Sequence, residues 1–89
     1  MINIGNLASD RTENGMQKED FIHGLGIHLR KLREERNMTQ TEIASIIGKD
    51  RQSYQRIELG ITNPTVGYLY DISNALKVPF TDLFSFIKG

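Results

Sequence analysis

Apolar residues recur at helical spacing along most of the chain from about Glu19 onward. The first set follows steps of four, four and three residues, which place it on one helix face: Phe21, Leu25, Leu29 and Leu32. Gly24 and Gly26 fall inside this helix, and each costs about 1 kcal/mol relative to alanine there. We therefore expect its first turns to fray. Asn37 is a residue type that ends helices, and we place the end of this one there.

Residues 39–60 predict two short helices joined by a tight turn at Gly48. Thr39 and Glu42 have the T-x-x-E spacing of a capping box, and Asp50 can cap the second helix. The first helix carries an apolar face of Ile43, Ala44 and Ile47. The second carries an apolar face of Tyr54, Ile57 and Leu59.

The rest of the chain predicts a loop and two further helices. Pro64 disfavours a helical residue before it, so residues 61–64 form the loop, and Thr65 can cap the fourth helix. The apolar positions of that helix are Val66, Leu69, Tyr70, Ile72, Ala75 and Leu76. A short last helix runs from Phe80 to about Ile87. With no alternating strand pattern in the sequence, we predict an all-α fold, a compact five-helix bundle.

Composition limits the class of protein. The chain has 89 residues, 38% of them hydrophobic and 25% charged, which suits one small globular domain. We assign that domain to residues 19–89 and a flexible N-terminal tail to residues 1–18, which hold few apolar residues. No run approaches the ~20 apolar residues of a membrane helix, and no secretory signal is visible. The chain has no cysteine. We expect a cytoplasmic protein.

A polar row, formed by Arg51, Gln52, Gln55 and Arg56, follows the exposed side of the second short helix. Two helices, a tight turn and such a row are the layout of a helix-turn-helix, whose second helix enters the DNA major groove. The region from about Leu25 to Phe86 resembles the phage repressor/Cro-type (xenobiotic-response-element) family of regulators. The matching pieces are LRKLREERNMTQTEIA, Glu58-Leu59-Gly60, Asn63-Pro64 and LYDISNALKVPFTDLF.

The resemblance implies a lambda-repressor-like DNA-binding domain, with residues 39–60 as its helix-turn-helix and residues 50–59 as its recognition helix. The DNA-binding residues that it implies are Gln40, Arg51, Gln52, Ser53, Gln55 and Arg56. Arginine suits guanine and glutamine suits adenine, through paired hydrogen bonds to the base edge. Gln40 would clamp a phosphate. Taken alone, the same polar row also suits an ordinary solvated helix face.

Other residues receive structural roles from the resemblance. Arg33 and Glu58 would form an internal ion pair, with a phosphate contact by Arg33 left open. Two residues depart from the family: Lys49, whose amine can reach solvent or phosphate, and Tyr54, whose hydroxyl we expect at the rim of the core. Asp50 is either a helix cap or an acceptor for cytosine N4. The dimer interface would include Phe80, Phe84, Phe86 and Ile87, which otherwise only close the core.

The formal net charge of zero argues against strong nonspecific DNA binding. Residues 28–60 hold seven basic side chains against five acidic ones, a small excess in the region that the resemblance assigns to DNA. Residues 1–18 carry no excess of basic side chains, which favours a tail over a DNA-contacting arm. We expect modest nonspecific affinity and a homodimer.

The leading hypothesis is a transcriptional regulator, either a repressor or a controller, that binds specific double-stranded DNA. The alternative is a protein–protein interaction module on the same fold, with an antitoxin-like protein partner. An enzyme is disfavoured, because no nucleophile–base pair or close carboxylates are visible. His23 and His28 are five residues apart and point to different helix faces. We expect no cofactor, no metal and no membrane contact.

Overall fold

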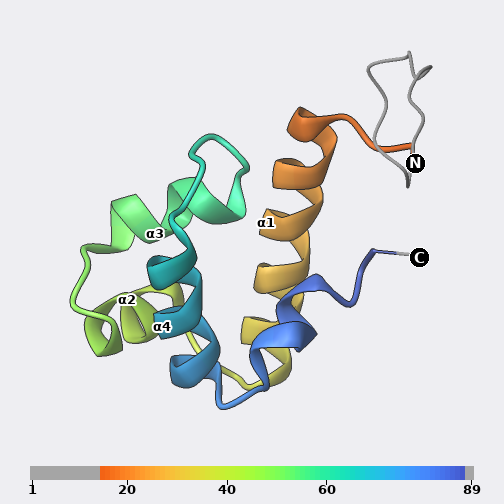
Figure 1. Ribbon diagram of the computed structural model, residues 1–89. Helices are drawn as coiled ribbons and strands as arrows, with labels where there is room; N and C mark the ends of the chain where they lie inside the picture. Colours follow the sequence, from red (N-terminus) through yellow and green to blue (C-terminus); the bar gives the residue numbers. More distant parts are fainter. Residues whose placement is uncertain (1–14, 88–89) are drawn as a thin grey trace.

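The computed structural model describes residues 15–87, and this part of the chain is helical without any strand. The elements are α1 (Lys18–Glu35), α2 (Gln40–Ile46), α3 (Arg51–Glu58), α4 (Val66–Leu76) and a 3-10 helix, η1 (Phe80–Phe84) (Figure 1). The predicted all-α class is therefore confirmed. Of the predicted tail, residues 1–14 lie outside the described range, and α1 begins at Lys18.

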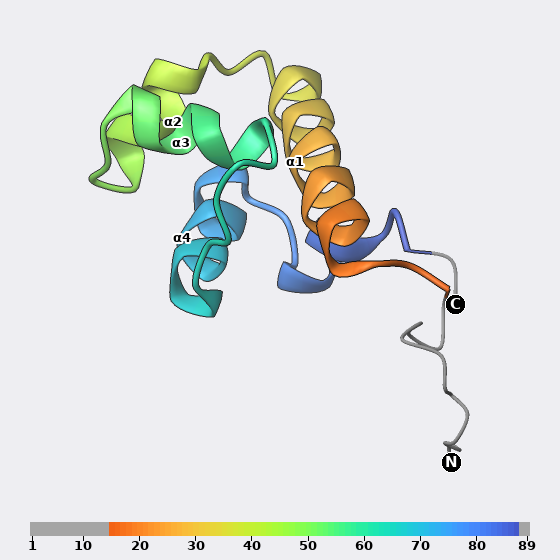
Figure 2. The same ribbon diagram turned by 90° about the horizontal axis from the view of Figure 1, so that it is seen from above.

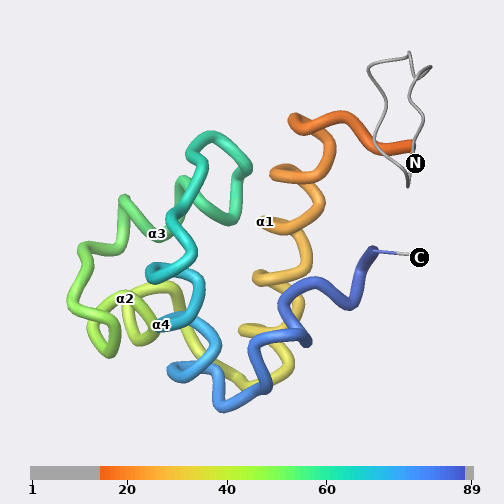
Figure 3. Tube along the Cα trace, in the orientation of Figure 1, coloured from red at the N-terminus to blue at the C-terminus, as the bar shows by residue number. Residues whose placement is uncertain are grey.

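The helices surround one core. α3 contacts both α1 and α2, α4 contacts α2, and η1 bridges α1 and α4. Figure 2 shows α2 away from α1, α3 extending from α2 toward α1, and the segment after α4 returning toward α1. The backbone trace in Figure 3 shows the chain reversing between α2 and α3. The core consists of Leu25, Leu29, Leu32, Ile43, Ala44, Tyr54, Ile57, Leu69, Ile72, Ala75, Leu76, Val78 and Leu83.

Local capping signals start and stop the central helices. Thr39 and Glu42 form both hydrogen bonds of a capping box, at 3.0 Å and 2.8 Å. Gly48 ends the α2 turn at φ 73°, a left-handed conformation in which glycine has no Cβ penalty. Asn37 adopts φ 55° just after α1, as its residue type allows. These signals act over three or four residues, which is why they can be read in the sequence.

Helix α1 is continuous through Gly24 and Gly26, so the frayed start that we expected is not seen. The reason is a close helix crossing. A Cβ on Gly26 would overlap the backbone carbonyl oxygens of Ile57 and Glu58 at the end of α3. The missing side chain lets α1 and α3 approach each other, and tertiary packing then offsets the poor helix propensity of glycine.

Three of the apolar residues predicted along the helix faces do not lie in the core. Leu59 is 54% exposed, Val66 is 72% exposed and Tyr70 also lies mostly in solvent. Leu59 and Val66 lie at helix ends, where the chain turns and the helical period no longer fixes which side faces the core. Residues 15–87 contain no helix with the length and hydropathy needed to cross a bilayer.

The predicted last helix from Phe80 to Ile87 was also wrong, since only a five-residue 3-10 helix forms there. Aromatic packing decides its path. Phe84 stacks on Phe21 of α1 with ring centroids 6.2 Å apart, and Phe86 lies 5.7 Å from the same ring. His28 of α1 hydrogen-bonds through Nε2 to the Asp82 carbonyl oxygen at 2.8 Å. These contacts hold the segment across α1, in place of a regular α-helical turn.

Candidate nucleic-acid interface

The polar row predicted on α3 faces outward. Arg51, Gln52 and Arg56 are exposed, while Ser53 and Gln55 are half-buried. The opposite face of the helix is inserted in the core through Tyr54 and Ile57, which are almost completely buried. The helix therefore has a fixed rotation about its own axis, and its polar row forms part of the molecular surface.

The start of α3 is held by Asp50. Its carboxylate accepts the Ser53 backbone N–H at 3.0 Å and the Ser53 hydroxyl at 2.7 Å. Both hydrogen bonds favour the ionised form, so they lower the pKa of Asp50 below its ordinary value. Asp50 therefore acts as the N-cap. The Ser53 hydroxyl proton is engaged, and its oxygen remains an acceptor on the surface.

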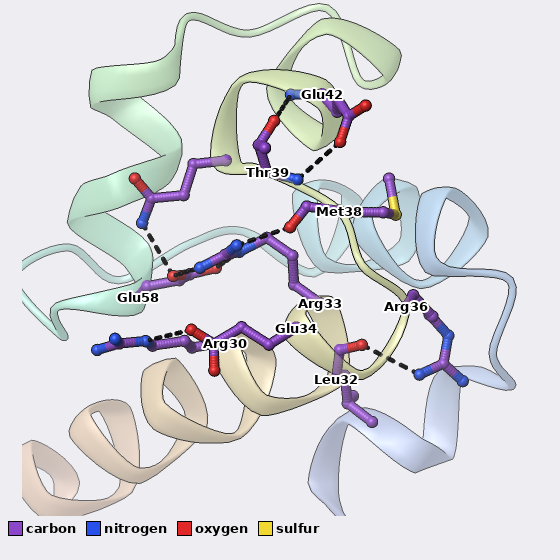
Figure 4. Close-up of polar contacts among 10 residues, drawn as sticks. Arg30, Leu32, Arg33, Glu34, Arg36, Met38, Thr39, Glu42 and Glu58 are labelled. Atoms are coloured by element: carbon purple, nitrogen blue, oxygen red, sulfur yellow. Dashed lines mark hydrogen bonds and ion pairs between the residues drawn. The ribbon is translucent and has the colours of Figure 1, made fainter.

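A buried ion pair joins α1 to the end of α3 (Figure 4). Arg33 donates from Nε to Glu58 Oε2 at 2.7 Å and from Nη2 to Glu58 Oε1 at 3.0 Å. The two side chains are only 10% and 2% exposed. Arg33 Nη1 also donates to the Met38 carbonyl oxygen at 2.8 Å, so one guanidinium connects α1, α3 and the loop before α2.

Gln40, the first residue of α2, belongs to the same network. Its Nε2 donates to Glu58 Oε1 at 2.9 Å, which leaves the second N–H of the amide and the amide oxygen for other partners. Burial opposes ionisation of Glu58, but hydrogen bonds from Arg33 and Gln40 outweigh it and lower the pKa of Glu58. The same carboxylate raises the pKa of Arg33 against the effect of its burial. The pair is therefore ionised.

The family model described as helix-turn-helix matches residues 29–83, which include α2, α3, α4 and the C-terminal part of α1. The chain belongs to the helix-turn-helix family. A curated relative from Sinorhizobium fredii, named as the uncharacterized HTH-type transcriptional regulator y4wC, is 34% identical over 73 residues, or 81% of this chain. The chain spans only about half (51%) of the length of that relative.

Solved structures show the same helix-turn-helix fold. The restriction-modification controller protein C.AhdI from Aeromonas hydrophila is 27% identical, with a TM-score of 0.69 over 71% of this chain and 96% of that one. The restriction-modification controller protein C.Esp1396I, solved as a tetramer with its natural 35 base-pair operator, is also 27% identical. Its TM-score is 0.69, over 75% of this chain and 88% of that one.

One residue of this helix-turn-helix departs from expectation, and another makes a contact that was not expected. The Tyr54 hydroxyl does not lie at the rim, because the whole side chain is buried. Burial raises the pKa of Tyr54 far above its ordinary value, and the nearby Glu58 carboxylate adds to this effect. Lys49, directly after the turn glycine, places its Nζ over the Tyr68 ring, 5.2 Å from the centroid. An aromatic ring of α4 thus supports the turn.

One residue that joins α1 to α4 was missed in the sequence. Arg36 belongs to a charged run that looks like a solvated face, yet its Nε donates to the Leu76 carbonyl oxygen at 2.7 Å. Its Nη1 donates to the Leu32 carbonyl oxygen at 3.1 Å. Arg36 therefore satisfies carbonyl groups in the last turns of α1 and α4. No local spacing indicates this contact, because Leu76 is 40 residues away along the chain.

Proposed function

We propose that this chain is a transcriptional regulator, a repressor or a controller, that binds a specific double-stranded DNA sequence with α3 in the major groove. The observation that supports this most is the outward polar row on a helix whose other face is locked in the core. A major groove about 12 Å wide admits such a helix. The protein would act in the cytoplasm, together with the DNA, and would be no enzyme.

We assign base reading to Arg51, Gln52 and Arg56, which are the exposed polar residues of α3. Ser53 and Gln55, half-buried beside them, would lie near the DNA backbone or a base edge. Each paired contact between arginine and guanine, or glutamine and adenine, contributes ~1–3 kcal/mol of discrimination. Gln40 would clamp a phosphate with the donor that its hydrogen bond to Glu58 leaves over.

We also propose a homodimer, in which the C-terminal segment contributes Phe80, Phe84, Phe86 and Ile87 to the interface. All four side chains are half-buried, so each retains surface for a second copy after closing its own core. A two-fold dimer would read two half-sites about 34 Å apart. This arrangement would compensate for the near-neutral charge of the single chain, since two weak contacts act together.

The test begins with selection of bound duplexes from a random library, followed by Arg56→Ala. We expect this variant to lose affinity for the selected duplex by about 10-fold or more, from ~1–3 kcal/mol of lost discrimination, and to lose much less on random duplex. Lys31→Ala is the matched control, because it removes one positive charge from an exposed position on α1. Equal losses on both duplexes would show that Arg56 does not read bases.

The second candidate function is a protein-interaction module on the same fold. Val66 and Tyr70 support it, since both are large apolar side chains exposed on one side of α4, and the Tyr70 ring lies 6.4 Å from that of Phe80. The same selection separates the candidates. Enriched duplexes with two inverted half-sites support the DNA-binding dimer, whereas no enrichment even at low salt favours the protein partner.

A further inference from the structure

A hollow of about 470 Å³ opens where α1, α2 and α3 meet. Arg30 of α1, Gln40 of α2 and Arg51 of α3 line its walls, and the Arg33–Glu58 ion pair lies within it. Figure 4 shows the Arg30 side chain extending toward the same side as Arg33 and Glu58. The hollow thus lies beside the polar row of α3, on the flank nearer to α1.

The lining of this hollow holds more basic than acidic side chains, although the net charge of the chain is zero. Its lining has three arginines against one glutamate, a net charge of +2. The neighbouring hollow on α1 is neutral, since Arg30 and Lys31 face Glu34 and Glu35. Other hollows among the described residues carry one charge or a balanced pair. Among these hollows of the described residues, the one beside α3 therefore has the most basic lining.

The arginines differ in what they can still bind. Arg33 is engaged through three of its nitrogens with Glu58 and the Met38 carbonyl, so it contributes charge more than donors. Arg30 is held only through Nε, by Glu34 Oε2 at 3.0 Å, and the two side chains are 65% and 55% exposed. Such an exposed pair is weak, about 0–1 kcal/mol, and the terminal nitrogens of Arg30 remain directed to solvent.

We infer that this hollow binds one phosphate of the DNA backbone, and that Arg30 is a DNA-contacting residue. A guanidinium forms paired, charge-assisted hydrogen bonds with phosphate oxygens, and Gln40, which also lines the hollow, has one N–H left over as a neutral donor. The inference rests on the proposed function, and it extends that function from the helix-turn-helix to α1. Glu34 competes with the phosphate for Arg30.

The experiment measures binding of the full chain to the selected duplex and to random duplex at several salt concentrations. We expect Arg30→Ala to weaken both complexes alike and to reduce the slope of log K against log salt by about 1. Lys31→Ala, the next residue along α1, should leave the slope unchanged. Glu34→Gln should bind both duplexes more tightly than the wild type. Thermal unfolding checks that each variant is folded.

A duplex with a single uncharged methylphosphonate locates the contact. At one position along the duplex, the methylphosphonate should weaken binding of the wild type. It should not weaken binding of Arg30→Ala, because this variant already lacks the guanidinium that contacts that phosphate. An unchanged salt slope for Arg30→Ala, with Arg56→Ala still impaired, would overturn this inference and leave the proposed function intact. If inorganic phosphate shifts the Arg30 and Gln40 NMR signals while Arg30→Ala binds DNA normally, the hollow binds a free anion and the inference fails. A wild type that binds no duplex refutes the proposed function itself.

Discussion

The helix-turn-helix and the C-terminal segment that closes the core are stabilised in different ways. In the first, helix caps and a buried ion pair fix the angle and rotation of α3, and Glu58 accepts three hydrogen bonds. In the second, residues 80–87 form little regular structure and are held mainly by rings of Phe21, Phe84 and Phe86, with a hydrogen bond between His28 and the Asp82 carbonyl oxygen. Directional contacts hold the proposed reading surface, and adaptable aromatic contacts hold the opposite end of the molecule.

The position of α3 therefore depends on a few polar atoms. A buried carboxylate is stable while all its hydrogen-bond partners are present. Removal of one member of the ion pair leaves the other charge buried without a partner, which lowers the free energy of unfolding. Aromatic packing loses stability more gradually, because many weak contacts share it. Substitutions should therefore affect the two regions unequally.

The largest expected effect is that of Glu58→Ala. It leaves the Arg33 guanidinium buried without its carboxylate, and breaking a buried pair in this way costs about 3–5 kcal/mol of the free energy of unfolding. The matched control is Glu34→Ala, which removes the exposed partner of Arg30 and should cost at most ~1 kcal/mol. Chemical denaturation measures both. Similar losses in the two variants would mean that the buried pair has no special role.

The ion pair and the central helices were largely accessible from the sequence. Thr39, Glu42, Gly48 and Asp50 act within their own turns, so residue type and spacing are enough to predict α2 and α3. The ion pair of Arg33 and Glu58 could be predicted only from the resemblance to the family, because no local spacing rule relates residues 25 positions apart. The DNA contacts remain a prediction, because the polar row has the same appearance whether it binds DNA or water.

The two glycines of α1 give the next comparison, with an intermediate effect. Gly26→Ala would force a Cβ against the carbonyl oxygens of Ile57 and Glu58, which are backbone atoms and cannot swing away. We expect a loss of about 1–3 kcal/mol or more. In Gly24→Ala the new Cβ would lie 2.9 Å from the Phe86 ring, at the end of a side chain that can move.

The Gly24→Ala variant should therefore be near neutral, because the gain in helix propensity, about 1 kcal/mol, offsets a small shift of Phe86. Thermal unfolding of the two single variants gives the comparison directly. If Gly24→Ala is as damaging as Gly26→Ala, the C-terminal segment is as rigid as the crossing of α1 and α3, and the contrast between the two regions is wrong.

What the sequence could not predict depends on contacts between distant residues. The Phe80–Ile87 stretch has helical spacing, but its rings pack on Phe21 and its backbone is held by His28, 54 residues from Asp82. Arg36 is similar, since its carbonyl partner belongs to another helix. Leu59 lies just after the end of α3, so helical spacing no longer determines whether its side chain faces the core.

The smallest expected effect is a dependence of stability on pH. In the folded protein, the hydrogen bonds from Arg33 and Gln40 hold the pKa of Glu58 below its ordinary value of 4.5. A depressed carboxyl pKa contributes stability above the unfolded pKa, and this contribution is lost as pH falls through the folded pKa. The free energy of unfolding should therefore fall on acidification below about pH 4.5. Glu58→Gln lacks this contribution of an ionised carboxylate. The difference in free energy of unfolding between wild type and variant should therefore become smaller as the pH falls.

Phe86→Ala serves as the control from the other region. It removes a half-buried ring without touching a carboxylate, so its stability curve should run parallel to that of the wild type at a lower level. Denaturation at a series of pH values measures all three proteins. If the difference in free energy of unfolding between wild type and Glu58→Gln stays constant at acidic pH, ionisation of Glu58 does not contribute to stability. The side chain of Glu58 would then stabilise the fold only by packing and neutral hydrogen bonds.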